Sequence, residues 1–132
     1  MTRALELYHT MVAVLKEGDD AKSRALIHPD FVMYEDEGMP YGGVYRGVDG
    51  FMTLIAKVWE CWGGSHFEPQ YQMEDADGTR ICAVVLFRGQ PGNAAEPVET
   101  LINEVWTFKD DKAIEARVWY YDTPSLRRAM GL

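Results

Sequence analysis

Two glutamates stand among apolar residues in segments that alternate like β-strands. Glu35 follows Phe31 and Met33 at two-residue spacing, and Glu104 precedes Trp106 at the same spacing. Because alternate residues of a strand share one face, both carboxyl groups are expected on the inward face of a sheet. Apolar surroundings favour the neutral acid and raise its pKa, so that the group can donate or accept a proton near neutral pH. We therefore treat Glu35 and Glu104 as candidate catalytic residues.

A structural role for these two glutamates stays open. Each carboxylate could pair with an arginine such as Arg88 or Arg117, or could lie at the solvated mouth of the sheet. Buried charges in proteins are usually paired. One glutamate alone fits both interpretations, whereas two glutamates on inward faces favour the catalytic one.

Motifs for several other chemistries are absent from the sequence. It contains no GxGxxG, no phosphate-binding GxxxxGK(S/T), no HExxH and no CxxC. The histidines, His9, His28 and His66, are too scattered for a local metal site. Cys61 lies in an apolar helical pattern that is typical of a buried residue and would need an adjacent base to act as a nucleophile. The sequence therefore predicts neither a metal nor a cofactor.

Length and composition indicate one globular domain that spans residues 1–132. Of its 132 residues, 47% are hydrophobic and 26% are charged, and the net charge is −8. An acidic surface repels phosphate, so neither nucleic acid nor an anionic membrane is expected as a partner. The first residues hold no uninterrupted apolar stretch of the signal or anchor type, which favours a cytoplasmic location.

Apolar periodicity and turn residues predict the elements that must position the two glutamates. Helices are expected at 4–17, 19–27 and 48–62, a strand at 31–36, four strands from Ser65 onward, and a last helical turn at 126–130. His28-Pro29 is expected to end the second helix, and a glycine-rich segment at 40–47 precedes the third. Helices followed by a run of strands indicate an α+β fold with an antiparallel meander.

The predicted sheet is apolar on both faces. Residues 81–87 are seven apolar residues in succession. Leu101, Val105, Trp119 and Tyr121 fall on the face that the helices are not expected to cover. Exposed apolar patches of this size usually mark an interface, so we expect a homodimer formed through this face.

Several segments resemble the SnoaL-like branch of the nuclear transport factor 2-like superfamily, which is related to the ketosteroid isomerases. They are Gly18-Asp19, His28-Pro29-Asp30-Phe31, the stretch from Pro40 to Gly47, and Val118-Trp119-Tyr120-Tyr121-Asp122-Thr123. The resemblance covers essentially the whole chain. It implies a cone-shaped, cystatin-like fold in which a curved, mostly antiparallel sheet wraps around a long N-terminal helix, with two further helices. It also implies a pocket at the open end of the cone and dimers through the outer sheet face.

The resemblance also implies roles for the two glutamates. Glu35 falls where the ketosteroid isomerases have their proton-shuttling carboxylate, and Glu104 where they have the protonated acid of the oxyanion hole. Met11 and Ile55 stand where that family has tyrosines. Tyr8 lies one helical turn before Met11 and is a possible second donor.

The expected function is cofactor-independent proton transfer, of the isomerase or cyclase type, on an apolar or aromatic carbonyl compound in the cone pocket. Glu35 would be the base and Glu104 the donor to the developing enolate. The expected substrate-binding residues are Tyr8, Met11, Trp59, Trp106 and Tyr120. The alternative is a module of the same fold that binds a small ligand or dimerises without catalysis. A cavity of roughly 300 Å³ or more that reaches both glutamates would favour the enzyme, and a filled interior the module.

Overall fold

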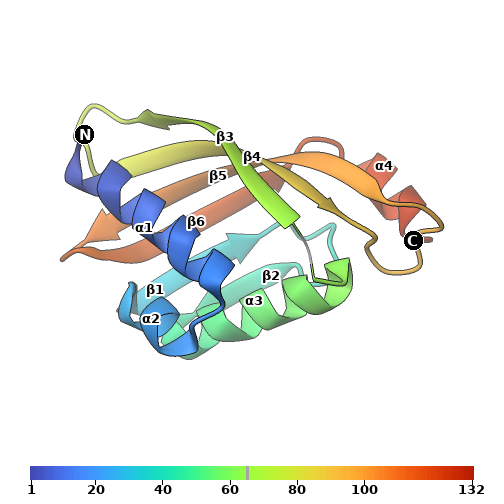
Figure 1. Cartoon of the computed structure of the whole chain (residues 1–132), viewed down its shortest axis with the longest axis horizontal. Coiled ribbons are helices and arrows are strands. Elements are labelled where there is room, and N and C mark those ends of the chain that lie inside the picture. The colour runs from blue at the N-terminus through green and yellow to red at the C-terminus, as the bar shows by residue number, and fades with distance from the viewer. Residues whose placement is uncertain (65) are drawn as a thin grey trace.

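One six-stranded sheet carries the fold (Figure 1). The computed structural model describes residues 1–64 and 66–132. The strands are β1 (Ile27–Glu35), β2 (Gly43–Arg46), β3 (His66–Glu74), β4 (Arg80–Gly89), β5 (Val98–Lys109) and β6 (Lys112–Tyr120). Their order is β2-β1-β6-β5-β4-β3, and every neighbouring pair is antiparallel except β1 and β6. The predicted α+β class with a mostly antiparallel sheet is confirmed.

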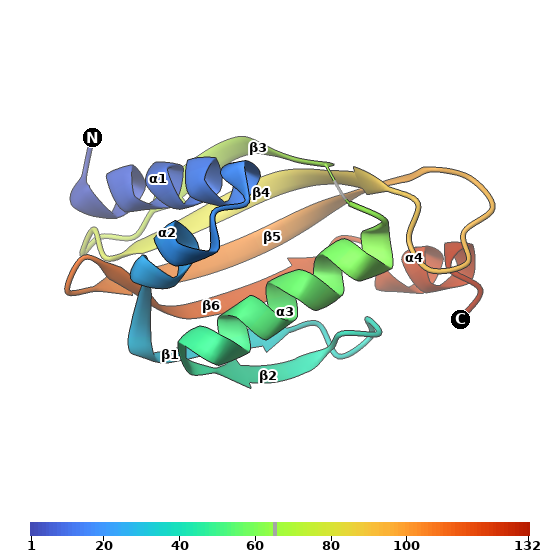
Figure 2. The ribbon, with the colours of Figure 1, turned by 60° about the horizontal axis from the view of Figure 1, so that its bottom comes forward.

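Three helices, α1 (Arg3–Glu17), α2 (Asp20–Ala25) and α3 (Gly47–Trp62), lie on one face of this sheet (Figure 2). The apolar sides of α1 and α3 face the strands, and Tyr8, Met11, Leu54 and Val58 are buried there. Helix α4 (Thr123–Ala129) lies at the opposite end of the molecule from the N-terminus. The other face of the sheet is therefore left largely without helices.

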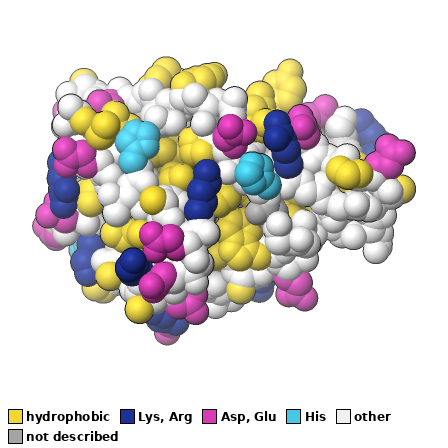
Figure 3. Space-filling model, viewed as in Figure 1, with side chains coloured by type: hydrophobic (Ala, Val, Ile, Leu, Met, Phe, Trp, Pro, Cys, Tyr) yellow, Lys and Arg dark blue, Asp and Glu magenta, His cyan; other side chains and the backbone are white. Residues whose placement is uncertain are grey.

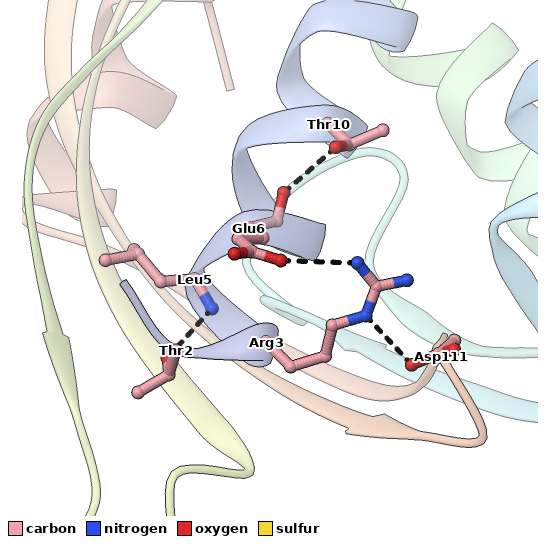
Figure 4. A network of polar contacts seen from close by, with 6 residues as sticks. All are labelled: Thr2, Arg3, Leu5, Glu6, Thr10 and Asp111. Atoms are coloured by element: carbon pink, nitrogen blue, oxygen red, sulfur yellow. Dashed lines mark hydrogen bonds and ion pairs between the residues drawn. The ribbon is translucent and has the colours of Figure 1, made fainter.

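Polar contacts fix the start of α1 (Figure 4). The Leu5 amide donates to the Thr2 side chain at 3.3 Å, which satisfies one of the free amides of the first turn. Arg3 donates to Glu6 at 3.3 Å and to Asp111 at 3.0 Å. Because Asp111 lies between β5 and β6, this second contact ties the helix to the sheet.

Side chains of β4 and β5 alternate between a buried and a more exposed face. On β4, Ile81 and Val85 are buried against the helices, whereas Val84 is half-buried on the other side. Trp106 of β5 is buried, and Leu101 is 38% exposed. This alternation is the one that the sequence predicted.

The structure corrects several element boundaries. Helix α2 ends at Ala25, and β1 begins at Ile27, so His28-Pro29 belongs to the strand and does not end the helix. Proline has no amide hydrogen for the ladder, and the register with β6 shifts between Ile27 and Val32. The glycine-rich segment holds a strand, β2, for which the sequence pattern predicts no element, and α4 begins at Thr123, earlier than expected. Ser65, the expected start of the run of strands, lies outside the described residues.

Candidate active site

A cavity of about 70 Å³ lies between α1, α3 and the inner face of the sheet. All seven residues expected at the site line it: Tyr8, Met11, Glu35, Trp59, Glu104, Trp106 and Tyr120. Apolar side chains complete the lining: Val12, Leu15, Met33, Leu54, Ile55, Val58, Phe67, Val85, Phe87, Ile102 and Val118. The site is thus an apolar space into which few polar groups project, as is common for small-molecule sites.

The sheet register places the two glutamates on either side of β6. Glu104 of β5 pairs with Val118 of β6. Tyr34 of β1 pairs with Arg117, so Glu35, the next residue, comes level with Val118 from the other side. Neighbouring strands lie about 4.8 Å apart, so two such spacings separate the backbones of the two glutamates. One strand and one inward valine thus lie between the two carboxyl groups.

Glu104 receives a hydrogen bond from its own strand. The indole nitrogen of Trp106, two residues on and on the same face, donates to Oε1 of Glu104 at 3.2 Å. Burial raises the pKa of Glu104 to about 7, while the indole donor counteracts the shift. A donor of this kind favours the ionised carboxylate.

Glu35 is in a different environment. Its side chain is buried, and its Oε1 has no hydrogen-bond partner among the described residues. Burial, followed by the nearby charge of Glu104, raises the pKa of Glu35 to about 8, and the Asp36 backbone and, to a smaller extent, the Tyr120 hydroxyl counteract part of this shift. An unpaired buried oxygen favours the neutral acid. The contacts of the two glutamates thus favour the carboxylate at Glu104 and the neutral acid at Glu35, which is opposite to the roles that the resemblance implied.

A buried hydrogen-bonded chain leads toward Glu35. The indole nitrogen of Trp62 donates to the Tyr41 hydroxyl at 3.0 Å, and the Tyr41 hydroxyl is bonded to that of Tyr120. Trp62 can only donate, so Tyr41 accepts from it and can pass its own proton toward Tyr120. Tyr120 then has its proton free for Glu35 or for a ligand.

Neither Tyr41 nor Trp62 was expected at the site. The bond from Tyr41 to Tyr120 joins residues 79 positions apart, and no local spacing in the sequence indicates it. The one available signal was a tyrosine inside the glycine-rich segment, at a position where most turn residues are polar.

Tyr8 reaches the cavity from α1. Burial, followed by the charge of Glu104, raises the pKa of Tyr8 above its ordinary value. Its hydroxyl therefore stays protonated at neutral pH and can donate a hydrogen bond into the cavity. Met11, from the same helix, contributes only apolar surface.

The described residues contain no group of three or more His, Cys, Asp or Glu side chains placed to hold a metal ion. Across the same residues, no helix is long and apolar enough to cross a membrane.

Comparison with known proteins identifies the family. The model of the SnoaL-like domain matches residues 8–116. The chain belongs to the SnoaL-like family. Among curated proteins, none matches the sequence of this SnoaL-like chain.

Solved structures share the fold along nearly the whole SnoaL-like chain. An NTF2-like protein of unknown function from Burkholderia pseudomallei has a TM-score of 0.86 and 21% identity, with 100% of both chains covered. TerC, co-crystallised with polyporic acid, has a TM-score of 0.83 and 21% identity, covering 99% of this chain and 100% of TerC. A candidate SnoaL-like polyketide cyclase from Jannaschia has a TM-score of 0.76 and 13% identity, covering 98% of this chain and 94% of the other. At such identities the likeness shows the fold alone.

The cavity of this SnoaL-like domain reaches both glutamates but is narrow. Its volume of about 70 Å³ is well below the roughly 300 Å³ that small-molecule sites usually offer. Side chains at the mouth must therefore move before a ligand larger than a few atoms can reach the carboxyl groups.

Proposed function

We propose that this SnoaL-like domain catalyses cofactor-independent proton transfer on an apolar carbonyl compound, with Glu35 and Glu104 as the catalytic residues. The observation that carries the proposal is two carboxyl groups with raised pKa values in one apolar cavity. Burying two ionisable groups where apolar residues would pack costs stability, and such a cost is typical of active sites.

The environments of the two carboxyl groups divide the roles. Glu104 is stabilised as a carboxylate by the Trp106 indole, whereas Glu35 has an unpaired buried oxygen and favours the neutral acid. When only one of the two carboxyl groups is protonated, these contacts favour the proton on Glu35. We therefore assign the base to Glu104 and the hydrogen-bond donor to Glu35, the reverse of the roles that the family resemblance implied.

In an isomerisation, the Glu104 carboxylate would remove a proton from the carbon next to the carbonyl group. The Glu35 carboxylic acid would donate a hydrogen bond to the enolate oxygen, with Tyr8 as a second donor. Glu104 would then return the proton to a different carbon of the same molecule. The apolar walls exclude water, which strengthens both interactions with the developing charge.

The test is conversion of cyclohex-3-en-1-one to its conjugated isomer, followed by ultraviolet absorbance. Glu104→Gln removes the base and should lower the rate by about 10²–10⁴-fold. Glu35→Gln should cost less than the roughly 10²–10³-fold expected for a lost oxyanion donor, because glutamine still donates a hydrogen bond. Glu115→Gln, on the outer face of β6, is the matched control and should leave the rate unchanged.

The pH dependence gives an independent measurement. The rate should rise as Glu104 ionises and fall as Glu35 loses its proton, which gives a bell-shaped profile with both limbs above the ordinary pKa of a glutamate. A larger loss in Glu35→Gln than in Glu104→Gln would restore the roles that the resemblance implied. Unchanged turnover in both variants would remove the catalytic proposal.

The second candidate is a module that binds a small ligand without catalysis. The narrowness of the cavity, about 70 Å³, favours it. TerC was co-crystallised with a small molecule, which supports small-ligand binding as a property of this fold. Binding of cyclohex-3-en-1-one without turnover would support this candidate.

We also propose that the domain is a homodimer, as the sequence predicted. The outer face of the sheet exposes large apolar side chains: Tyr71, Met73, Leu101, Trp119 and Tyr121. A second copy of the chain would remove this surface from water. Location in the cytoplasm also stays a prediction.

A further inference from the structure

A wall of three side chains separates the cavity from an open groove. Leu15, Trp59 and Phe67 line both the cavity and a surface groove of about 500 Å³. The rings of Trp59 and Phe67 are stacked, with centroids 5.8 Å apart and planes 20° from parallel. All three side chains are only half-buried. Moving the two rings into the groove would break their stacking on the Phe87 ring, whose centroid lies 6.3 Å from that of Trp59 and 6.4 Å from that of Phe67.

A lysine stands over this wall. The Lys16 ammonium lies 5.4 Å from the centroid of the Phe67 ring and lines the groove, together with His66. In the space-filling view, apolar side chains gather between α1, α3 and the start of β3, with basic and histidine side chains beside them (Figure 3).

The charge of Lys16 has no partner in the described part of the chain. Its neighbour Glu17 pairs instead with Lys22, at 3.3 Å. The protein as a whole has a net charge of −8, but the charge beside this groove is positive. It can attract a negative group on a ligand without first breaking an ion pair.

We propose that the substrates of this site are apolar carbonyl compounds with an anionic substituent, and that they enter between Trp59 and Phe67 while Lys16 holds the anionic end in the groove. This inference rests on the proposed function, since it names the substrate class of the same site. The cavity is large enough only for the reacting end of such a molecule, and the groove supplies the space for the remainder.

Two fluorescent probes that differ only in charge test the proposal. 1-Anilinonaphthalene-8-sulfonate is anionic, and N-phenyl-1-naphthylamine is the same skeleton without the sulfonate. Lys16→Gln should weaken binding of the anionic probe about three- to fivefold and leave the neutral probe unchanged, as expected for one exposed charge pair. Lys16→Glu should weaken the anionic probe further, because the new charge repels the sulfonate.

Lys57 provides the matched control. Its ammonium lies 5.3 Å from the centroid of the Tyr45 ring, the same kind of contact as that of Lys16, but away from the groove. Lys57→Gln should change the affinity for neither probe. Equal losses in Lys16→Gln and Lys57→Gln, or equal losses for both probes in Lys16→Gln, would overturn the role of Lys16.

Carboxyl NMR tests passage through the wall. Binding of the anionic probe should move the side-chain carboxyl resonances of Glu35 and Glu104, which line the cavity, and leave that of exposed Glu115 in place. If the carboxyl resonances of Glu35 and Glu104 do not move, the probe binds only in the groove, and the proposed entry between Trp59 and Phe67 is overturned. Because no probe measurement requires turnover, failure here leaves the proposed function intact. Unchanged turnover in both Glu35→Gln and Glu104→Gln would conversely remove the catalytic proposal and leave the charge selectivity of the groove standing.

Discussion

Each face of the sheet carries a few side chains that depart from the usual division between an apolar core and a polar surface. On β5 and β6, Glu104 points inward with Trp106 and Tyr120, into an apolar cavity. On the outward side, Trp119 is 49% exposed and Tyr121 is 82% exposed. Polar groups that prefer water are enclosed, and aromatic groups that prefer burial face solvent.

The two departures lower the stability of the folded domain for different physical reasons. The inner face sacrifices stability to hold carboxyl groups whose proton affinity suits chemistry near neutral pH. The outer face leaves apolar area in water, and that cost disappears only if another surface covers it. A substitution that removes a buried carboxyl group should therefore leave association through the outer face unchanged, and a substitution on the outer face should leave the buried carboxyl groups unchanged.

Glu35→Met should give the largest effect on stability, because it replaces a buried carboxyl group with an apolar side chain of similar length. The pKa of Glu35 is about 8 in the folded protein, above its ordinary value of 4.5. The stability that the neutral acid contributes is therefore complete below pH 4.5 and is lost as the pH rises through 8. At pH 8 and above, Glu35→Met should raise the free energy of unfolding by on the order of 3 kcal/mol, measured by urea denaturation.

The increase in the free energy of unfolding of Glu35→Met should be smaller at pH 5, because the Glu35 carboxyl group of the unaltered protein is neutral in the folded state at that pH. Glu115→Met is the control from the outer face, where Glu115 is half-exposed and pairs with Arg117 at 2.9 Å. It should change the free energy of unfolding by less than about 1 kcal/mol. If Glu35→Met does not raise the free energy of unfolding at pH 8, Glu35 does not destabilise the folded protein.

Trp119→Glu tests the outer face. If a second copy covers Trp119, the substitution buries an unpaired charge at the interface, which costs about 2 kcal/mol or more and weakens association roughly 30-fold. Sedimentation equilibrium at micromolar concentration measures the change, and Trp119→Phe should preserve association. The unaltered protein sedimenting as a monomer would contradict the predicted homodimer.

The strand alternation made the inner face predictable from the sequence. Glu35 and Glu104 share faces with apolar residues two positions away, and this local pattern predicts the inner face for both, where the structure has the cavity. The helical periodicity of α1 likewise predicts that Tyr8 and Met11 lie on its apolar side, and both line the cavity. Such patterns determine the face on which a side chain lies but not the partner that it meets.

The relation between the two glutamates was not predictable, because it depends on contacts between distant segments. The difference between them lies in an indole donor at Glu104 and an unpaired oxygen at Glu35. Local propensity also misplaces the start of β1, since it predicts a helix end at His28-Pro29, whereas β1 begins at Ile27 and includes Pro29. The volume of the cavity depends on how side chains of four elements pack, which no local pattern contains.

Tyr41→Phe should give the smallest effect, and it tests whether the chain from Trp62 to Tyr120 acts on Glu35. Without the Tyr41 hydroxyl, Tyr120 loses the donor that makes its own proton a better hydrogen-bond donor. Since the Tyr120 hydroxyl holds down the pKa of Glu35, that pKa should rise by about half a pH unit, or roughly 0.7 kcal/mol. Carbon-13 titration of the Glu35 carboxyl group measures the change.

Tyr45→Phe is the control for this prediction, because the Tyr45 hydroxyl donates to the Tyr41 backbone carbonyl at 2.8 Å and takes no part in the hydrogen-bonded chain of side chains. An equal rise in both variants would assign the effect to general loosening around Tyr41, and a rise in Tyr41→Phe alone would assign it to the hydrogen-bonded chain.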